Sequence, residues 1–403
     1  MSRATLGLVL IVSCAHLLVH VYELSLPSVE QEIAKDYDVS TETTGLLSTY
    51  WRLPWGLGAL GAGWLVDRYG ARRMLVAYLL GCAGMCVLAG LPISLPTLFG
   101  CMFAMGTFAS IYHPAGLALI SHETSIENRT RALSIHGIFG TAGFGSAFLA
   151  GLVLQTTSSW RLYYWLLAVP GVLLGLVFIV LALRRRDSNI AARSVNHGAD
   201  DEQDRTDWKA FFTLMTMAML TGFTYSAVLA FLPRYMDSAV INILGSAPKG
   251  AGNYLTGGTL LVGCMGQFLA GRIARPAILE RQFTFILFGT VPCLIWMAVA
   301  QGWGRVAAAA MFSLIHFMHQ PIYNSLVAKY TPRRRRSLCY GLGFAMASGI
   351  GSVGAWYTGF VQDRVEGHAA QMEMAAAYGT SAAIAAVAGI LGIFLWRHNR
   401  WGG

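Results

Sequence analysis

Three ionisable side chains interrupt an apolar stretch near the start of the chain. The segment IVSCAHLLVHVYELSLPSV, residues 11–29, contains His16, His20 and Glu23. Spacings of four and three residues place them on one face of a helix. Imidazole gains and loses a proton near neutral pH, so histidines beside a carboxylate are suited to loading and releasing protons. The pattern predicts proton transfer within a segment that is otherwise hydrocarbon.

Two more histidines extend this set. His113 stands before Pro114 in the apolar sequence YHPAG, and His136 lies in the next apolar stretch. A proline within a helix frees a backbone carbonyl, which favours a local opening beside His113. An ionisable group near the bilayer centre costs at least ~2.5–3.5 kcal/mol, so each should line a cavity or bond to a neighbour. The expected proton carriers are His16, His20, Glu23, His113 and His136. For any one histidine, a neutral imidazole hydrogen-bonded between helices is the alternative.

Arg52 is a basic residue deep within an apolar run. At 1.5 Å per residue it lies roughly 10 Å from the outer end of that run, at about the same depth as His20. Glu23 lies one turn shallower, so adjacent antiparallel helices would bring all three within reach. Arg52 is expected either to bind an anionic group of a substrate or to neutralise Glu23. Trp51 and Trp55 add aromatic surface beside it.

The second half of the chain has its own polar group within apolar sequence. SLIHFMHQPIYNSLV carries histidines at spacings of three, and TGFTYSAVLAF carries one tyrosine. Binding pockets are mostly apolar with a few polar anchors, although aromatic side chains in such helices also serve as packing. The candidate substrate-binding residues are Arg52, Trp51, Trp55, Tyr225, His319, Gln320, Tyr323 and Asn324.

A metal site is the weakest of the alternatives considered for the histidines. His16 and His20 have the i, i+4 spacing that chelates a divalent ion from one helix face. No cysteine lies one helical turn from either histidine, and no group of carboxylates stands beside them. We therefore expect no metal site and no cofactor, and transport of a metal or metal chelate is the least favoured function.

The elements that would position these residues are membrane-spanning helices. The 403 residues are 55% hydrophobic and 12% charged, with a mean hydropathy of +0.53. About 25% charged residues is usual for soluble domains, and each long apolar run approaches the ~20 residues that span a bilayer. The sequence predicts an all-α membrane protein with twelve spans, near residues 4–27, 45–66, 74–92, 97–120, 132–155, 162–183, 210–232, 254–273, 282–301, 306–328, 338–361 and 374–396.

The distribution of basic residues predicts the orientation of these spans. With the N-terminus inside, the inner segments carry twenty-two Lys and Arg residues and the outer loops carry six. The positive-inside rule then places both termini in the cytoplasm. The runs RRRD and RRRRS read as topology signals and contacts with anionic lipid. The net charge of +9 is therefore not taken as a sign of nucleic-acid binding.

A polar segment divides the chain into two similar halves. Residues 184–209 mix acidic, basic and small residues and cannot form a core, so they are expected to be a cytoplasmic linker. The expected domains are a six-helix bundle at 1–183 and a second at 210–403. YHPAG in the fourth span is echoed by HQPIY in the tenth. Parallel repeats of this kind build transporters with a site near the membrane midplane.

The loop between the second and third spans carries a recognisable motif. In GWLVDRYGARR, Gly63, Asp67, Arg68, Gly70, Arg72 and Arg73 match the pattern G-x-x-x-D-R-x-G-x-R-R. With the twelve spans and the central linker, the chain resembles the major facilitator superfamily throughout its length. The resemblance implies alternating access, with these six residues closing the cytoplasmic side. A monomer is the expected state.

A narrower similarity concerns the first, fourth and fifth spans. SCAHLLVHVYELSLPSV, GTFASIYHPAG and SIHGIFGTAGFGSAFLAG resemble the fosmidomycin-resistance branch of efflux proteins. That branch has an acid where this chain has His20 and another where it has Ala115. The resemblance implies proton-coupled efflux of a small amphipathic or anionic compound, by antiport, across a bacterial inner membrane. Proton-coupled import of an organic anion or metabolite is the alternative. No loop carries the spacing of a catalytic site, so an enzyme is not expected.

Overall fold

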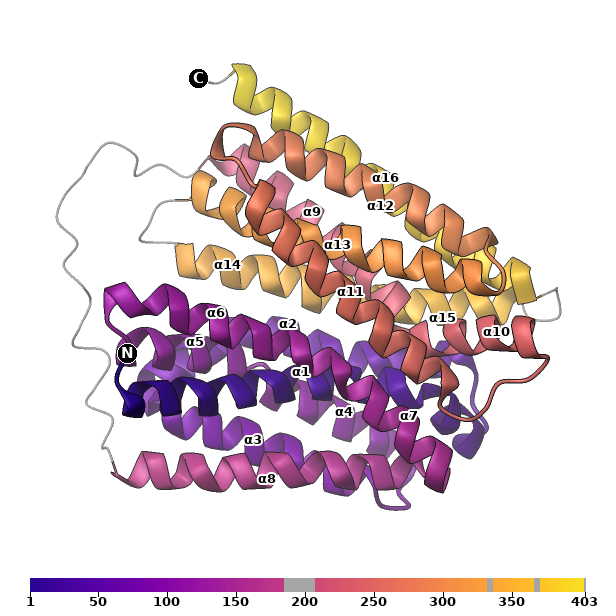
Figure 1. Ribbon diagram of the computed structural model, residues 1–403, viewed down its shortest axis with the longest axis horizontal. Coiled ribbons are helices and arrows are strands. Elements are labelled where there is room, and N and C mark those ends of the chain that lie inside the picture. The colour runs from indigo at the N-terminus through magenta and orange to yellow at the C-terminus, as the bar shows by residue number, and fades with distance from the viewer. Residues whose placement is uncertain (185–206, 332–335, 366–369, 402–403) are drawn as a thin grey trace. The chain divides into compact units, whose positions relative to one another are not determined.

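The computed structural model describes residues 1–184, 207–331, 336–365 and 370–401, and within them it contains helices and no strands (Figure 1). Most of the predicted linker, residues 185–206, lies outside the described residues. The chain divides into two compact units. Unit 1 comprises residues 1–29 and 50–197, and unit 2 comprises residues 30–49 and 198–403.

Two long helices begin the chain, and both are divided between the units. They are α1 (Arg3–Tyr37) and α2 (Thr41–Tyr69), and their adjoining ends, residues 30–49, group with unit 2. Unit 1 continues with α3 (Ala71–Ala89), α4 (Leu95–Ala109), α5 (Tyr112–Glu123), α6 (Ile126–Ala142), the 3-10 turn η1 (Gly143–Gly145), α7 (Ser146–Thr157) and α8 (Trp160–Arg184). The predicted first six apolar runs all fall on these helices.

Unit 2 holds the remaining helices. These are α9 (Trp208–Ala230), α10 (Leu232–Leu244), α11 (Ala251–Ile273), the 3-10 turn η3 (Pro276–Ile278), α12 (Leu279–Val299), α13 (Trp303–Tyr330), α14 (Arg336–Phe344), α15 (Val353–Val365) and α16 (Ala370–Trp401). Between α14 and α15 the helix passes through a π turn, η5 (Ala345–Gly349), and a 3-10 turn, η6 (Ile350–Ser352).

One expectation about the connections is wrong. The predicted spans 210–232 and 254–273 leave residues 233–253 as an outer loop between them, but Leu232–Leu244 is the helix α10. Its first turn contains Pro233, which lacks only an N–H that would have no acceptor there. Tyr235, Met236 and Ala239 bury one apolar face, and Gly245, with φ of 77°, ends the helix. Its polar residues on the other face made this short amphipathic helix resemble a loop.

Nine helical stretches within the described residues are long and apolar enough to cross a membrane. The other predicted spans lie on α2, α11 and α13, helices of 29, 23 and 28 residues. Polar residues within these three helices lower their hydropathy. Arg52 in α2, Gln267 in α11 and His319 in α13 are examples.

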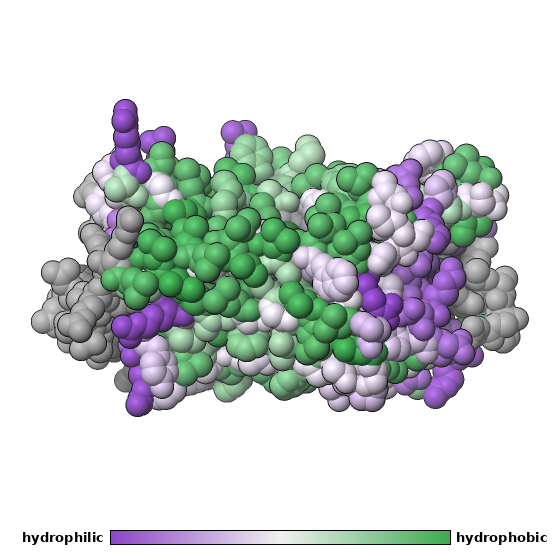
Figure 2. Space-filling model, turned by 90° about the horizontal axis from the view of Figure 1, so that it is seen from below, coloured by the Kyte–Doolittle hydropathy of each residue, from purple (hydrophilic) through white to green (hydrophobic). Residues whose placement is uncertain are grey.

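The outer face of α8 is apolar along most of the helix. Its exposed side chains are Trp165, Leu166, Val169, Val172, Leu173, Leu176, Val177, Val180 and Leu183. Figure 2 views the molecule from this side: hydrophobic residues fill the middle of the face, and hydrophilic ones gather towards its ends. An apolar surface of this extent is stable only against lipid.

Two helices of unit 1 are interrupted near the histidines. Ser110 and Ile111 separate α4 from α5, and Pro114, four residues after Ser110, has no N–H to bond the Ser110 carbonyl. The turn η1 separates α6 from α7. Both irregularities fall within predicted spans, where such backbone is tolerated only if other protein groups surround it.

Candidate functional site

The histidines of the first half lie together in the interior of unit 1. His16 and His20 come from α1, His113 from the start of α5 and His136 from α6. The ring of His16 stacks on that of His136 with centroids 3.9 Å apart, and its centroid lies 5.1 Å from His20 and 5.5 Å from His113. Residues more than ninety positions apart in the sequence thus form one imidazole cluster.

Two glycines, Gly140 of α6 and Gly143 of the following turn η1, make this approach of helices α1 and α6 possible. A Cβ atom at Gly140 would overlap the ring of His16, and one at Gly143 would overlap the backbone of Leu17 and the Cβ of His20. Side chains larger than hydrogen would push the helices apart. Gly137, in contrast, has open space around it.

A tyrosine that sequence reasoning missed connects the cluster to α1. The hydroxyl of Tyr112 donates to the carbonyl of Val12 at 2.9 Å and lies 2.8 Å from Nε2 of His136. Because the hydroxyl has one proton and gives it to Val12, Nε2 of His136 must be the donor of the second bond. Nδ1 of His16 donates to the carbonyl of His136 at 2.8 Å. These bonds define the tautomers of His16 and His136.

Glu23 joins the cluster to Arg52. One carboxylate oxygen accepts from Nη2 of Arg52 at 2.9 Å, and the other bonds Nδ1 of His20 at 2.7 Å. Glu23 and Arg52 are 3% and 1% exposed. A buried carboxylate of this kind needs a cation and hydrogen bonds to remain ionised. The structure therefore brings Glu23, His20 and Arg52 together as the depths of their helices suggested.

The two tryptophans of α2 border the same cluster. Trp55 lies against His113 and His20, with ring centroids 6.1 Å and 6.5 Å away, and it contacts Trp51 at 5.1 Å. Trp51 is 2% exposed, and its indole N–H has no hydrogen-bond acceptor among the described residues. A buried donor without an acceptor is a natural contact for a bound polar group.

The candidate residues of the second half lie in unit 2. Tyr225 of α9 stacks on His316 with centroids 5.3 Å apart, and His316 lies 4.6 Å from His319. Nδ1 of His319 bonds the carbonyl of His316. This grouping places Tyr225 and His319 together.

The other three candidates of α13 point elsewhere. Gln320 is exposed and accepts a bond from Gln267 of α11 at 2.6 Å. Tyr323 packs against Phe283, and its hydroxyl has no bond to any residue that the structure describes. Asn324 has an exposed side chain. They therefore do not form one group with Tyr225 and His319.

The motif after α2 forms a turn at a single residue. Gly70, with φ of 88°, separates the end of α2 from the start of α3, and a side chain there would be strained. Arg72 is buried and ion-paired with Glu123 of α5. Arg68 lies over the ring of Trp64, 5.4 Å from its centroid.

The remaining motif residues are more exposed. Gly63 has no neighbour where a Cβ would lie, and Arg73 and Asp67 face outward. Within the described ranges, Asp67 makes no hydrogen bond or ion pair. The structure thus places Arg72, but not Asp67, in a specific contact.

A second buried carboxylate, which the sequence did not single out, lies in unit 2. Glu30 accepts two bonds from Arg234 of α10, at 2.9 and 3.1 Å, and one from Thr44 at 2.6 Å. One turn from Arg234, Asp237 accepts from Gln31 at 2.6 Å. Burial raises the pKa of the Asp237 carboxyl, although this bond acts against the rise. Glu30 lies just after the first predicted span, residues 4–27, where an acidic residue is usual in an exposed loop. Nothing in the sequence therefore indicated that it would be buried.

Asp363 of α15 makes the next contact in the same region. Its carboxylate accepts from the backbone N–H groups of Thr41 at 3.1 Å and Glu42 at 2.7 Å, the first residues of α2. An acid at this position caps the helix and complements its dipole. Residues 30–49 are thus held within unit 2 by side chains of α10 and α15.

Comparisons with known proteins agree with these features. The sequence model of the Major Facilitator Superfamily matches residues 11–356. The chain is 32% identical over 193 residues to the puromycin resistance protein of Streptomyces alboniger, covering 46% of this chain and 37% of that protein. It is 25% identical over 300 residues to the cis,cis-muconate transport protein of Acinetobacter baylyi, covering 72% and 69%.

The fold is also that of solved transporters. A bacterial homolog of the human lysosomal transporter Spinster, in an inward-facing and unoccupied conformation, has a TM-score of 0.79 over 98% of both chains, at 15% identity. The family match covers most of the chain, and the relatives are transporters rather than enzymes. This chain therefore belongs to the Major Facilitator Superfamily and is a multi-pass membrane transporter of a small molecule.

Proposed function

We propose that the protein exports a small amphipathic or anionic compound across a bacterial inner membrane in exchange for protons, by alternating access. The observation that carries this proposal is the continuous contact from Arg52 through Glu23 and His20 to His16. It provides a buried imidazole, His16, and a half-buried one, His20, that take up a proton beside an ion pair with no net charge.

The spacing of the imidazoles limits how many protons the cluster holds. Two unit charges about 5 Å apart repel by roughly 3 kcal/mol at an effective dielectric constant of 20. The centroids of His16 and His20 are 5.1 Å apart, so protonation of one opposes protonation of the other. The cluster therefore carries one proton at a time.

Trp51 and Trp55 are the proposed substrate contacts beside the proton carriers. Their rings offer an apolar surface, and the indole N–H of Trp51 donates to a polar group of the substrate. An anionic substrate competes with Glu23 for Arg52, and protonation of Glu23 favours that exchange. Tyr225 and His319, which lie together, are the proposed contacts from the second half. Contacts from Gln320, Tyr323 and Asn324 stay predictions from the sequence, because these side chains do not join that group.

The remaining parts of the proposal follow the membrane topology expected from the sequence. The chain spans the membrane twelve times as two six-helix domains, with both termini and the 184–209 linker in the cytoplasm. The motif Gly63, Asp67, Arg68, Gly70, Arg72 and Arg73 closes the cytoplasmic side. The protein acts as a monomer. The pair of Arg72 and Glu123 holds the motif against α5 within unit 1.

Inverted membrane vesicles with an imposed pH gradient test this function. Puromycin and cis,cis-muconate are suitable first probes, because relatives are named for them. Addition of an exported compound should dissipate the gradient. His113→Gln should abolish this proton movement while the compound still binds, and His122→Gln, at an exposed position of α5, should behave as the wild type. Equal proton movement in both variants would contradict the assignment.

Import of an organic anion is the second candidate. Two observations favour it: the muconate relative aligns with more of this chain than the puromycin relative does, and the cluster contains a buried arginine. Right-side-out vesicles distinguish the two directions. An importer accumulates labelled muconate when the outside is acidic, whereas an exporter does not.

A further inference from the structure

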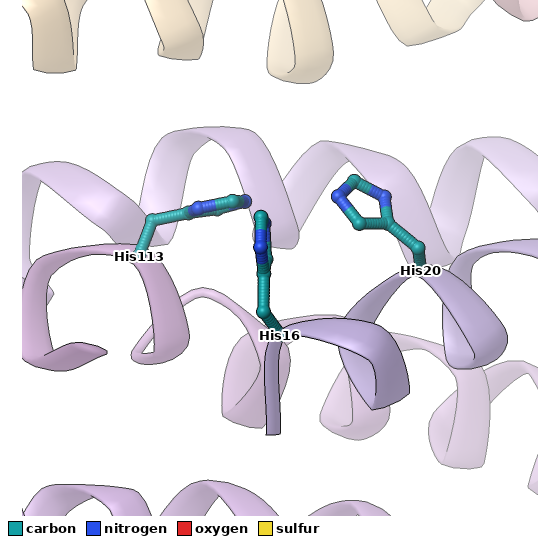
Figure 3. A group of neighbouring side chains, drawn as sticks. All are labelled: His16, His20 and His113. Carbon is teal, nitrogen blue, oxygen red and sulfur yellow. The ribbon is translucent and has the colours of Figure 1, made fainter. Parts of the chain in front are cut away.

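Three imidazoles of the cluster converge on one point. His16, His20 and His113 each present a ring nitrogen, and these three nitrogens all lie within 4.8 Å of one another. Figure 3 shows the ring of His16 between the other two, with His20 on the same helix and His113 reaching in from α5. The i, i+4 pair that is visible in the sequence thus gains a third nitrogen ligand from a residue 93 positions beyond His20.

Hydrogen bonds on Nδ1 fix the orientation of two of these rings, those of His16 and His20. Nδ1 of His16 donates to the carbonyl of His136, and Nδ1 of His20 bonds the carboxylate of Glu23. In the neutral imidazole, a proton on Nδ1 leaves the lone pair on Nε2. Histidines that bind metals are held in this way, by a carbonyl or a carboxylate on the other nitrogen.

We propose that His16, His20 and His113 bind one divalent transition-metal ion of the Zn²⁺ class, leaving a fourth coordination position open. Nitrogens bound to zinc at about 2.05 Å and tetrahedral angles stand about 3.3 Å apart. The rings therefore need to move together by no more than about 1.5 Å, which rotation about the side-chain bonds of His113 and His20 supplies. His136 is not proposed as a ligand, because the group of mutually close nitrogens consists of His16, His20 and His113.

The donor set selects the kind of ion. Three neutral imidazoles suit Zn²⁺, Co²⁺, Ni²⁺ and Cu²⁺, whereas Mg²⁺ and Ca²⁺ prefer oxygen ligands. Arg52 pairs with Glu23, so this carboxylate bonds Nδ1 of His20 and orients its ring instead of binding the ion. The site differs in this respect from carboxylate-rich sites for hard cations.

Metal and proton compete for the same lone pairs. Ligand histidines must be neutral, so the affinity for the ion falls as the solution is acidified. This inference does not depend on the proposed transport function, because binding needs neither a substrate nor a pH gradient. A bound ion would occupy the proposed proton carriers and so inhibit proton movement.

Purified full-length protein, freed of metal with a chelator, tests the site. Titration with Co²⁺ should give one equivalent of binding and the intense visible absorption of four-coordinate cobalt, without the near-ultraviolet band of a thiolate ligand. His113→Gln and His16→Gln should each weaken Zn²⁺ binding by about 100-fold or more. Loss of a residue that only orients a ligand already costs about 10–100-fold in metal affinity, and these variants lose a ligand itself. His122→Gln should bind like the wild type.

A measurement on the wild type alone tests the site even if the variants do not fold. X-ray absorption of the Zn²⁺-loaded protein should show nitrogen ligands with imidazole outer-shell scattering. A sulfur ligand, six oxygen ligands, or equal binding by the wild type and folded His113→Gln would overturn the proposal. None of these results bears on proton-driven transport, which the vesicle experiment tests separately.

Discussion

The carboxylate of Glu23 accepts hydrogen bonds from Arg52 at 2.9 Å and from His20 at 2.7 Å, one on each oxygen. This relationship gives Arg52 a structural task that precedes any contact with substrate. A carboxylate that is 3% exposed within a membrane helix stays ionised only while its cation is present. The sequence left two roles open for Arg52: to bind an anionic group of a substrate or to neutralise Glu23. In the structure Arg52 neutralises Glu23.

Replacement of Arg52 alone should destabilise the protein strongly. Arg52→Gln leaves Glu23 buried without its cation, and loss of one member of a buried pair costs about 3–5 kcal/mol. The melting temperature of the purified protein measures this loss. The double variant Glu23→Gln/Arg52→Gln should recover most of it, because no uncompensated charge remains. If the double variant is as unstable as Arg52→Gln, the unpaired charge of Glu23 is not the cause of the instability.

Gly140 should tolerate no side chain. Gly140→Ala places a methyl group where the ring of His16 lies, and overpacking of this kind costs about 1–3 kcal/mol. It should also displace His16 and reduce proton movement in vesicles. Gly137→Ala is the matched control on the same helix, because nothing lies where its methyl group would be. Equal stability of the two variants would contradict the close packing of α1 on α6.

Tyr112 should determine the tautomer of His136. Tyr112→Phe removes the oxygen that accepts from Nε2 of His136, so nitrogen NMR of labelled histidine should show a change at that ring. Tyr78→Phe is a matched control: Tyr78 also donates to a carbonyl of α1, that of Ala15, at 3.0 Å. Both variants should lose about 1–3 kcal/mol. Only Tyr112→Phe should alter the His136 signals.

Arg234 should stabilise the segment of residues 30–49. Arg234→Gln leaves Glu30 with a neutral side chain in place of two charge-assisted bonds, a loss of about 1.5–3 kcal/mol. Lys35→Gln removes the same charge from an exposed position of α1 and should change the melting temperature little. Protease or labelling access to residues 38–40 should rise in Arg234→Gln alone. A similar rise in both variants would indicate a general effect of charge.

Asp207 should make the stability of unit 2 depend on pH. Burial would raise the pKa of its carboxyl, but bonds from the Ala210 N–H at 3.0 Å and from His398 at 2.7 Å lower it. A lowered pKa stabilises the fold above about pH 3.9, the ordinary aspartate value, and this contribution disappears as the pH falls through the lowered pKa.

Two variants test this dependence. Asp207→Ala should cost about 1 kcal/mol at pH 7 by removing the cap of α9. Asp207→Asn keeps a capping oxygen but loses the titration, so its melting temperature should differ from the wild type at pH 7 and approach it near pH 3. An unchanged difference between the wild type and Asp207→Asn at both values would contradict the shift.

Periodicity and composition predicted the helical architecture well, because long apolar runs permit little else in a membrane. The family was visible in the motif from Gly63 to Arg73. The amphipathic helix α10 was missed, since its polar face gave a short segment the composition of a loop. The break between α4 and α5 could be anticipated from Pro114, whereas the π turn after α14 has no comparable signal in a single residue.

The site could be predicted only along individual helices. Spacing placed His16, His20 and Glu23 on one face, and depth placed Arg52 near them. Nothing in the sequence could show that His113 would complete a group of three nitrogens, because that depends on how α5 packs against α1. Tyr112 and Glu30 were missed for the same reason, because their hydrogen-bond partners lie on other helices.

Glu23 and Glu30 stand on the same helix, seven residues or about 10 Å apart. The first belongs to unit 1 and bonds Arg52, and the second belongs to unit 2 and bonds Arg234. Helix α2 repeats the arrangement, with Arg52 in unit 1 and Thr44 in unit 2. Each of these two helices thus carries one polar contact in unit 1 and one in unit 2, and in α1 Pro27 lies between the two carboxylates. Because each helix is shared, loss of helical structure in either one would remove contacts from both units.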